Sequence, residues 1–169
     1  MDAANAKIYM AGPLGFTEAG RLYHQTVLVP AVQAAGLEPL DPWDVDPELQ
    51  AVFALPVGSP ERRTRLPEVN RAIGARNARL IDECTAVLAV LDGNDVDSGT
   101  AAEIGYAAAK HKPVVGLRCD HRVTGDNEAT LVNLQVEWFV IESGGSLETD
   151  PRAAIAALER LAGSRAPRQ

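Results

Sequence analysis

The sequence has 169 residues, of which 46% are hydrophobic and only 5% aromatic, enough for one domain with a substantial core. This composition, rich in Ala, Val and Leu, favours α/β packing over a β-sandwich. The formal net charge of −7 argues against nucleic acid or an anionic membrane as the main partner, and no stretch is long enough to span a bilayer.

The start of the chain predicts a strand, a helix and a second strand. The apolar run Lys7–Ala11 predicts the first strand, which ends at the turn residues Gly12 and Pro13. A helix capped by Thr17 follows. Leu37–Asp41 predicts the second strand, and the proline within it is typical of a sheet edge.

Residues 42–67 interrupt this alternation, because five prolines break any long helix within them. A short helix near residues 48–54 is still compatible with the pattern. A disordered surface insertion would explain so long a segment, but Trp43 and several aliphatic side chains make it too apolar for that. We expect it to fold over the site as a lid-like loop.

The segment from Leu66 to Glu83 predicts an amphipathic helix, with apolar residues at helical spacing on one face. Asn77 lies on that same face. A polar group on a buried face needs a hydrogen-bond partner. Asn77 is therefore either a structural amide bonded to a neighbouring loop or a residue of the site, and the sequence leaves both interpretations open.

A continuous apolar run at Ala86–Leu91 predicts a central strand buried on both faces. A tight turn begins at Asp92, and Asp97 or Ser98 can cap the next helix. Gly99 allows other groups to approach the first turn of that helix closely. Open α/β sheets bind ligands at the carboxyl ends of their strands, so we expect the chemistry at this turn.

Glu103 lies early in this helix, whose other residues are mostly small and apolar. Acidic residues are common near a helix N-terminus simply because they favour the helix dipole. A buried carboxylate nevertheless needs a reason, and the dipole is expected to keep it ionised, as a nucleophile requires. Glu103 is therefore our candidate catalytic residue.

The final third of the chain predicts two more strands and a last helix. The strand at Lys112–Leu117 ends in a charged cluster at residues 118–122, whose arginines either belong to a solvated loop or contact a ligand. A short helix at residues 126–135, a fifth strand at 136–141 and a helix from Pro151 onward complete a parallel sheet with right-handed crossovers.

Residues 1–169 are expected to form a single domain, with a short polar tail at residues 1–6 and a second tail at 164–169. Cys84 and Cys119 lie in apolar segments without a CxxC pattern, which favours reduced thiols and a cytoplasmic location. The three histidines show no spacing typical of a metal site.

Three segments resemble the nucleoside 2-deoxyribosyltransferase family: IYMAGP at residues 8–13, DSGTAAEIGYA at 97–107, and KPVVGLRCDHR at 112–122, followed by Asn133. DSGTAAEIGYA is the specific signal. The resemblance covers most of the chain and is least defined at residues 42–67 and in the last helix. It implies a flavodoxin-like (Rossmann-like) five-stranded parallel sheet with helices on both faces. It also implies a cytoplasmic homo-oligomer without a metal or organic cofactor.

The resemblance further implies exchange of the base on a 2′-deoxynucleoside through a covalent deoxyribosyl-enzyme, with nucleosides and free nucleobases as partners. Glu103 stands at the position of the family's nucleophile, and Tyr9 matches the tyrosine that holds that carboxylate. Asp97 and Asn133 match sugar- or base-contacting positions, and Asn133 would act in a neighbouring subunit's site. The expected substrate-binding residues are Gly12, Pro13, Trp43, Asp92, Asp97, Ser98, Gly99 and Asn133.

Asn77 departs from the family pattern. Where characterised transferases carry an aspartate near the leaving base, the spacing places Asn77, whose amide has no titratable proton. We still count it among the catalytic positions. Protonation of the departing base then falls to another group, such as Asp92, or to solvent.

Two alternatives stay open. One is hydrolysis of nucleoside 5′-monophosphates on the same fold, and the other is a non-catalytic nucleotide-binding module, against which Glu103 and Tyr9 together argue. The resembling monophosphate hydrolases carry Ser at the positions of Asp97 and Asn133. A carboxylate repels a phosphate but accepts a hydrogen bond from a free 5′-hydroxyl. Unphosphorylated 2′-deoxynucleosides are therefore the expected substrates.

Overall fold

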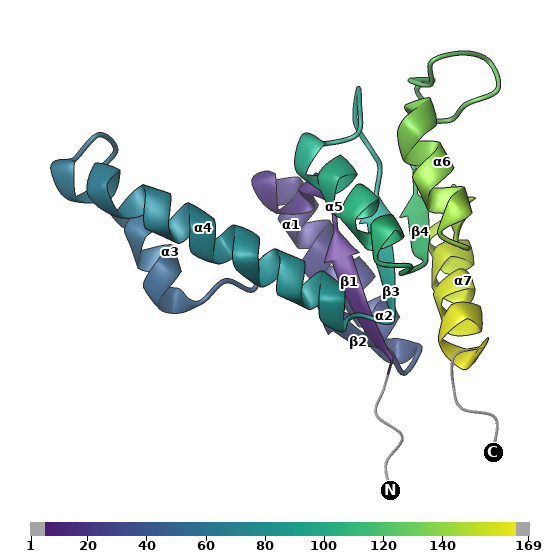
Figure 1. The fold of residues 1–169 in the computed structure, drawn as a ribbon, viewed down its shortest axis with the longest axis horizontal. Helices are drawn as coiled ribbons and strands as arrows, with labels where there is room; N and C mark the ends of the chain where they lie inside the picture. Colours follow the sequence, from purple (N-terminus) through teal and green to yellow (C-terminus); the bar gives the residue numbers. More distant parts are fainter. Residues whose placement is uncertain (1–5, 165–169) are drawn as a thin grey trace, which may run out of the picture.

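Five parallel strands form the centre of the computed structural model, which describes residues 6–164 (Figure 1). In chain order they are β1 (Lys7–Ala11), β2 (Glu38–Leu40), β3 (Ala86–Val90), β4 (Val114–Leu117) and β5 (Ser146–Glu148). They lie in the order β2-β1-β3-β4-β5, and every neighbouring pair is parallel. This is the flavodoxin-like order, so the expected fold class is confirmed.

Helical segments connect the strands. Those after β1 are η1 (Pro13–Phe16), α1 (Glu18–Tyr23), η2 (His24–Leu28) and α2 (Val29–Ala34). Those after the later strands are α3 (Pro47–Ala54), α4 (Pro60–Glu83), α5 (Ser98–Ala109), α6 (Leu134–Glu142) and α7 (Pro151–Ser164). None of the described helices combines the length and the hydrophobicity that crossing a bilayer would need.

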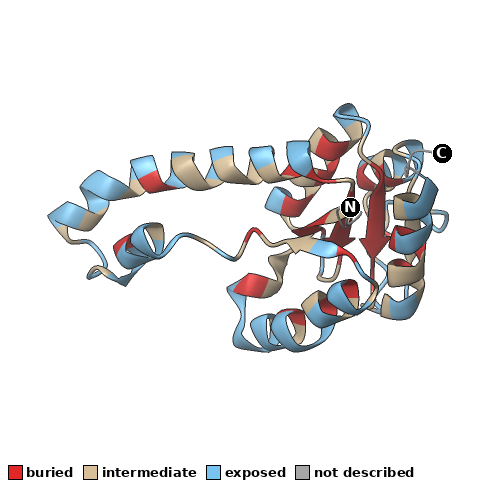
Figure 2. Ribbon diagram, turned by 90° about the horizontal axis from the view of Figure 1, so that it is seen from below, coloured by how far each residue is buried: buried red, intermediate tan, exposed pale blue. Residues whose placement is uncertain are grey.

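Two apolar layers cover the two faces of the sheet, because side chains alternate along each strand. Tyr9 and Ala11 of β1 point into the layer that α5 and α6 complete, whereas Ile8 and Met10 point into the layer of α2 and α7. The whole of β3 is buried, as its uninterrupted apolar run predicts. Figure 2 shows this buried centre in red, with exposed outer faces on the helices around it.

The helices α3 and α4 project from the sheet as one arm, and much of its surface is exposed (Figures 1 and 2). This arm corrects the loop expected over residues 42–67, because α4 begins at Pro60 and continues through Pro67. Pro60 is compatible with a helix start, since the first turn needs no amide donor. Ser59 caps the helix by accepting a hydrogen bond from the backbone nitrogen of Arg62 at 3.3 Å.

The fifth strand expected at residues 136–141 is wrong, because these residues lie within α6. Val136 and Val140 face the core, whereas Trp138 is about half exposed. A short apolar run does not distinguish a strand from a helix that carries apolar residues on both faces. The fifth strand is β5, which follows α6, and no regular helix occupies residues 126–133, where one was expected.

Two smaller differences concern the ends of elements. The helix expected after Thr17 is present, but a π-helical turn at His24–Leu28 separates its two α-helical parts. Of the expected tails, residues 1–5 and 165–169 lie outside the described residues. Ser164 is the last residue of α7 rather than the start of a tail.

Candidate active site

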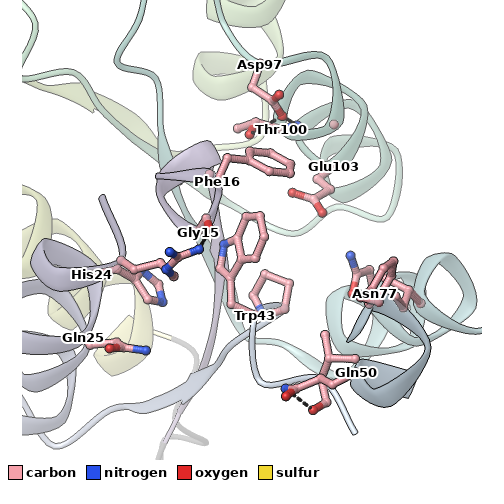
Figure 3. A pocket seen from close by; sticks show the side chains of 17 residues that line it. Gly15, Phe16, His24, Gln25, Trp43, Gln50, Asn77, Asp97, Thr100 and Glu103 are labelled. Carbon is pink, nitrogen blue, oxygen red and sulfur yellow. Dashed lines mark hydrogen bonds between the residues drawn. The ribbon is translucent and has the colours of Figure 1, made fainter. Parts of the chain in front are cut away.

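A cavity of about 660 Å³ opens at the carboxyl ends of β1, β2 and β3, where ligands of this fold class bind. The loops after β1 and β2 and the first turns of α5 form one side, and α3 and α4 form the other (Figure 3). The cavity lining includes Gly12, Gly15, Phe16, Arg21, His24, Trp43, Gln50, Phe53, Asn77, Asp97, Gly99, Thr100 and Glu103.

Glu103 is held in this cavity by a tyrosine from the sheet. Tyr9 donates a hydrogen bond from its hydroxyl to Oε1 of Glu103 at 2.6 Å. Tyr9 is fully buried on β1, so the sheet fixes where the hydroxyl points. Burial, with the Glu103 carboxylate beside it, raises the pKa of Tyr9 far above its usual value. The tyrosine therefore stays neutral and acts as a fixed donor to the carboxylate.

The pKa of Glu103 is raised above its ordinary value. Burial is the main cause and the nearby Asp97 carboxylate adds to it, while hydrogen bonds from Tyr9 and Asn77 act in the opposite direction. Glu103 lies beyond the first turn of α5, where the effect of the helix dipole has faded. The groups that favour the charged form of Glu103 in this structure are therefore the hydrogen-bond donors Tyr9 and Asn77 rather than the helix dipole.

The Tyr9→Phe substitution is expected to move the acid limb of the kcat/KM profile to higher pH. The hydroxyl lowers the pKa of Glu103, and a glutamate that serves as a nucleophile reacts only in its carboxylate form. A hydrogen bond to a charged group contributes about 1.5–3 kcal/mol, so the loss on the acid side should reach about tenfold or more. Tyr106→Phe is the matched control, because that hydroxyl donates to Asp82 outside the cavity. An unmoved acid limb in Tyr9→Phe would contradict the assignment.

Asn77 reaches the cavity from α4 and lies beside Glu103 (Figure 3). Its amide lowers the pKa of Glu103 by hydrogen bonding, as a donor does. Its other end, Oδ1, is buried and has no hydrogen-bond partner within the described residues. Of the two interpretations that the sequence left open, this geometry favours a residue of the site over an amide bonded to a loop.

Asp97, rather than Ser98, caps α5. Its Oδ2 accepts hydrogen bonds from the backbone nitrogen of Thr100 at 2.9 Å and from the Thr100 hydroxyl at 3.2 Å. Asp97, Gly99 and Thr100 all line the cavity, whereas Ser98 is exposed and does not. The cap therefore fixes a second carboxylate in the same cavity as Glu103.

Trp43 forms an aromatic wall of the cavity, and its place depends on a glycine. A Cβ atom at Gly15 would lie 2.0 Å from the indole ring, so only glycine lets Trp43 pack there. Phe16 meets the indole edge to face, with ring centroids 4.7 Å apart. Asp41 accepts a hydrogen bond from the Trp43 backbone nitrogen at 2.9 Å, which holds the loop after β2.

Several expected site residues lie elsewhere in the described structure. Asp92 points to the next loop, where its Oδ1 accepts hydrogen bonds from the backbone nitrogens of Cys119 at 2.6 Å and Asp120 at 2.9 Å. Asn133 caps α6 by accepting from Gln135 at 3.1 Å. Pro13 begins η1. None of Pro13, Ser98, Asp92 and Asn133 lines the cavity, although Gly12 and Trp43 do.

The two arginines of the cluster at residues 118–122 have structural partners. Arg118 is buried and donates to the carbonyl oxygens of Leu91 at 2.5 Å and Arg122 at 2.8 Å. Arg122 is exposed and pairs with Asp120. Neither lines the cavity, so the solvated-loop interpretation describes Arg122, and Arg118 ties the loops after β3 and β4 together.

The sequence did not single out several lining residues: Gly15, Phe16, Arg21, His24, Gln50 and Phe53. What could have indicated them is their position in the sequence. The loop after the first strand and the segment around Trp43 both follow the carboxyl end of a strand, where ligands bind in this class of fold. His24 is buried, and a hydrogen bond of 2.8 Å joins its Nε2 to Oδ2 of Asp41. Within residues 6–164 no group of three or more His, Cys, Asp and Glu side chains could hold a metal ion.

Comparisons with known proteins identify a family and a relative for this chain. The family model described as nucleoside 2-deoxyribosyltransferase matches residues 8–135. An uncharacterized Schizosaccharomyces pombe protein, C191.05c, is 31% identical over 121 residues, which are 69% of this chain and 51% of that protein. The chain thus spans about half the length of this curated relative.

Solved structures share the fold. A conserved protein from Enterococcus faecalis V583 is 21% identical with a TM-score of 0.66, over 93% of this chain and 99% of that one. A 2-desoxiribosyltransferase from Leishmania mexicana is 24% identical with a TM-score of 0.63, over 92% of this chain and 97% of that one. Because the family model covers most of the sequence, including Tyr9, Asn77, Asp97 and Glu103, the chain belongs to the nucleoside 2-deoxyribosyltransferase family.

Proposed function

We propose that this protein cleaves the N-glycosidic bond of 2′-deoxynucleosides and transfers the 2-deoxyribosyl group to a second nucleobase. The observation that carries the proposal is the buried Glu103 carboxylate, held at 2.6 Å by Tyr9 in a cavity at the strand ends. Family membership supports the same reaction. Reduced Cys84 and Cys119 suit a cytoplasmic enzyme of nucleoside salvage.

The chemistry follows from one carboxylate used twice. As the bond from C1′ to the base breaks, its electron pair leaves with the base and positive charge develops on the sugar. A lone pair of Glu103 forms a bond to C1′ and gives a covalent deoxyribosyl-enzyme. A ring nitrogen of the second base then attacks C1′, and the electrons of the ester bond return to Glu103. The second base releases its ring proton to solvent, and the departed base takes up one proton. A 2′-hydroxyl would disfavour the cationic sugar, so its absence favours deoxyribose.

We further propose that the substrates carry a free 5′-hydroxyl, which donates a hydrogen bond to Asp97. The Asp97 carboxylate lines the cavity and would repel a phosphate of roughly −2 charge by on the order of 1 kcal/mol. Arg118 and Arg122 do not offset this repulsion, because they bond to other groups. The competing function is hydrolysis of 5′-monophosphates. Arg21 is the feature that favours it, because this cation lines the cavity and donates to the carbonyl of Gly15 at 3.2 Å.

The Asp97→Ser substitution tests this proposal. Wild-type enzyme is expected to prefer a 2′-deoxynucleoside over its 5′-monophosphate, and Asp97→Ser should shift the kcat/KM ratio toward the monophosphate by about fivefold or more. Serine also caps helices well, so α5 is expected to remain folded. Asp95→Ser is the control, because it removes the same charge from an exposed residue outside the cavity. A wild-type preference for the monophosphate would overturn the proposal.

We also propose a homo-oligomer in which Asn133 serves a neighbouring subunit's site. Leu134, Trp138 and Ile141 form a half-exposed apolar stripe on α6, directly after Asn133, and a second copy could cover it. Mixing an inactive Glu103→Ala enzyme with an impaired Asn133→Ser enzyme should restore activity, because mixed oligomers contain one complete site. Serine keeps the cap of α6. An active monomer in light scattering, or no recovery on mixing, would rule this arrangement out.

A further inference from the structure

Few side chains that line the cavity can donate a proton to a departing base. Among the described residues that line it, the titratable ones are Arg21, His24, Asp97 and Glu103. Glu103 is needed as a carboxylate. Arg21 cannot give up its proton, because a guanidinium stays protonated in proteins. The remaining groups that could act as an acid are therefore His24 and Asp97.

Neither of these two groups is placed as an acid beside Glu103. A hydrogen bond of 2.8 Å joins Nε2 of His24 to Asp41, and Figure 3 shows His24 and Glu103 on opposite sides of Trp43. Asp97 is engaged by Thr100, which donates two hydrogen bonds to its Oδ2. Among residues 6–164, the cavity thus presents no proton donor next to the carbon that Glu103 would attack.

Asn77 occupies the place next to Glu103 and is an amide. In Figure 3 its nitrogen end points toward the carboxylate of Glu103, and hydrogen bonding from this amide lowers the pKa of Glu103. Its Oδ1 is buried and lacks a hydrogen-bond partner among the described residues, so its capacity as an acceptor is unused. An amide can stabilise a positive or donor-bearing base through this oxygen, but it cannot transfer a proton.

The charge of the base decides whether an acid is needed. A neutral base that leaves without a proton departs as an anion, and the lack of a general acid slows this step by about 100-fold or more. A base that already carries a positive charge departs as a neutral molecule. The C1′–N electron pair then cancels the positive charge on the ring, and no proton has to move.

Resting on the function proposed above, we infer that the preferred substrates are deoxyribosides of cationic bases, namely pyridinium or N-alkylpurinium rings. The aromatic faces of Trp43 and Phe16 suit a cationic ring, and the Asn77 oxygen is an additional negative end of a dipole. The second half of the reaction fits the same class. A neutral pyridine-type nitrogen attacks C1′, the ester electrons return to Glu103, and a pyridinium deoxyriboside forms without proton transfer.

The test compares nucleosides that differ in the charge of the base. The cationic probes are 7-methyl-2′-deoxyguanosine and nicotinamide 2′-deoxyriboside, and the neutral ones are the four common 2′-deoxynucleosides. Rates are measured by chromatography after subtracting the turnover of Glu103→Gln. Wild-type enzyme is expected to favour 7-methyl-2′-deoxyguanosine over 2′-deoxyguanosine by about 100-fold or more in kcat/KM.

A variant separates the missing acid from the greater intrinsic reactivity of a cationic substrate. Asn77→Asp places a carboxyl beside Glu103, where like charge favours its protonated form. This variant should raise turnover of the neutral nucleosides and lower the preference for the cationic probe by about tenfold. The gained turnover should disappear as the pH rises. Asn70→Asp on the exposed face of α4 is the matched control and should leave the preference unchanged.

Each outcome decides between the two proposals. Equal or faster wild-type cleavage of the neutral nucleosides overturns the inference about cationic bases and keeps the proposed function. An unchanged preference in Asn77→Asp also overturns it, as does a selective loss of neutral turnover in His24→Gln, which would identify His24 as an acid. Absence of Glu103-dependent cleavage of every probe overturns the proposed function itself.

Discussion

Glu103→Ala is expected to lower kcat/KM for base exchange at least ~100-fold, because the substitution removes the group that we propose forms the bond to C1′. The loss should be as large in Glu103→Gln, which keeps the size of the side chain but is a poor nucleophile. If Glu103 only positioned the substrate, glutamine would retain much of the rate. Comparing the two variants at saturating substrate separates these roles.

The control for this experiment is a carboxylate away from the cavity. Glu142→Ala removes an exposed side chain at the end of α6 and should leave the rate unchanged. Thermal unfolding of the Glu103 variants should show a folded protein. Because Glu103 is buried with a raised pKa, ionising it costs folding free energy at neutral pH, so glutamine is expected to be no less stable than wild type. Wild-type activity in either variant would remove Glu103 from the mechanism.

The second large effect is expected on stability, from the buried Arg118. Arg118→Met should lower the free energy of unfolding by about 3 kcal/mol, because the carbonyl oxygens of Leu91, Gly93 and Arg122 lose their donor in the interior. Urea unfolding measures this loss. Arg122→Met is the matched control, since that side chain is exposed, and its effect should stay below about 1 kcal/mol.

This comparison also decides between the two interpretations that the sequence allowed for Arg118. A structural arginine predicts a stability loss with little change in substrate preference among the molecules that stay folded. An arginine that binds a ligand predicts the reverse: normal stability and an altered ratio of nucleoside to monophosphate turnover. The second pattern would contradict the account of Arg118 as a tie between the loops after β3 and β4.

The centre of the fold was predictable because its residues are compatible with only one kind of element, a buried strand. The run from Ala86 is apolar at every position and bounded by turn residues, and it forms the fully buried β3. The peripheral α6 is different. Its apolar residues point both into the core and outward, so the period of a helix is hidden in a short run, and residues 136–141 resembled a strand.

Proline explains the second limit of the prediction. From the sequence alone, each proline between residues 42 and 67 predicts a break in a helix. Pro60, however, stands at the start of α4, where the amide hydrogen that proline lacks would have no partner within the helix. Within that segment only residues 42–46 and 55–59 lie outside helices. The arm of α3 and α4 therefore supplies a wall of the cavity, with Asn77 on it, where the sequence suggested a lid.

Some residues of the candidate site were likewise predictable from the sequence and others were not. Glu103 and Asp97 could be selected because they follow a central strand within a single motif. The packing of Trp43 over Gly15 could not, because it joins the loops after two different strands and depends on their relative position. In the sequence, Asp92 is as good a candidate for the site as Asp97. Only the fold shows that Asp92 instead accepts hydrogen bonds from the backbone nitrogens of Cys119 and Asp120.

The central claim is the covalent bond between Glu103 and the sugar, and mass spectrometry tests it most directly. Wild-type protein is incubated with a slowly reacting 2′-fluoro analogue of a 2′-deoxynucleoside, and peptides are then mapped for the added sugar. We expect one adduct, on Glu103, that is absent from Glu103→Gln and is lost when a free acceptor base is added. An adduct on another residue, or turnover of the analogue with no adduct at any time, would contradict it.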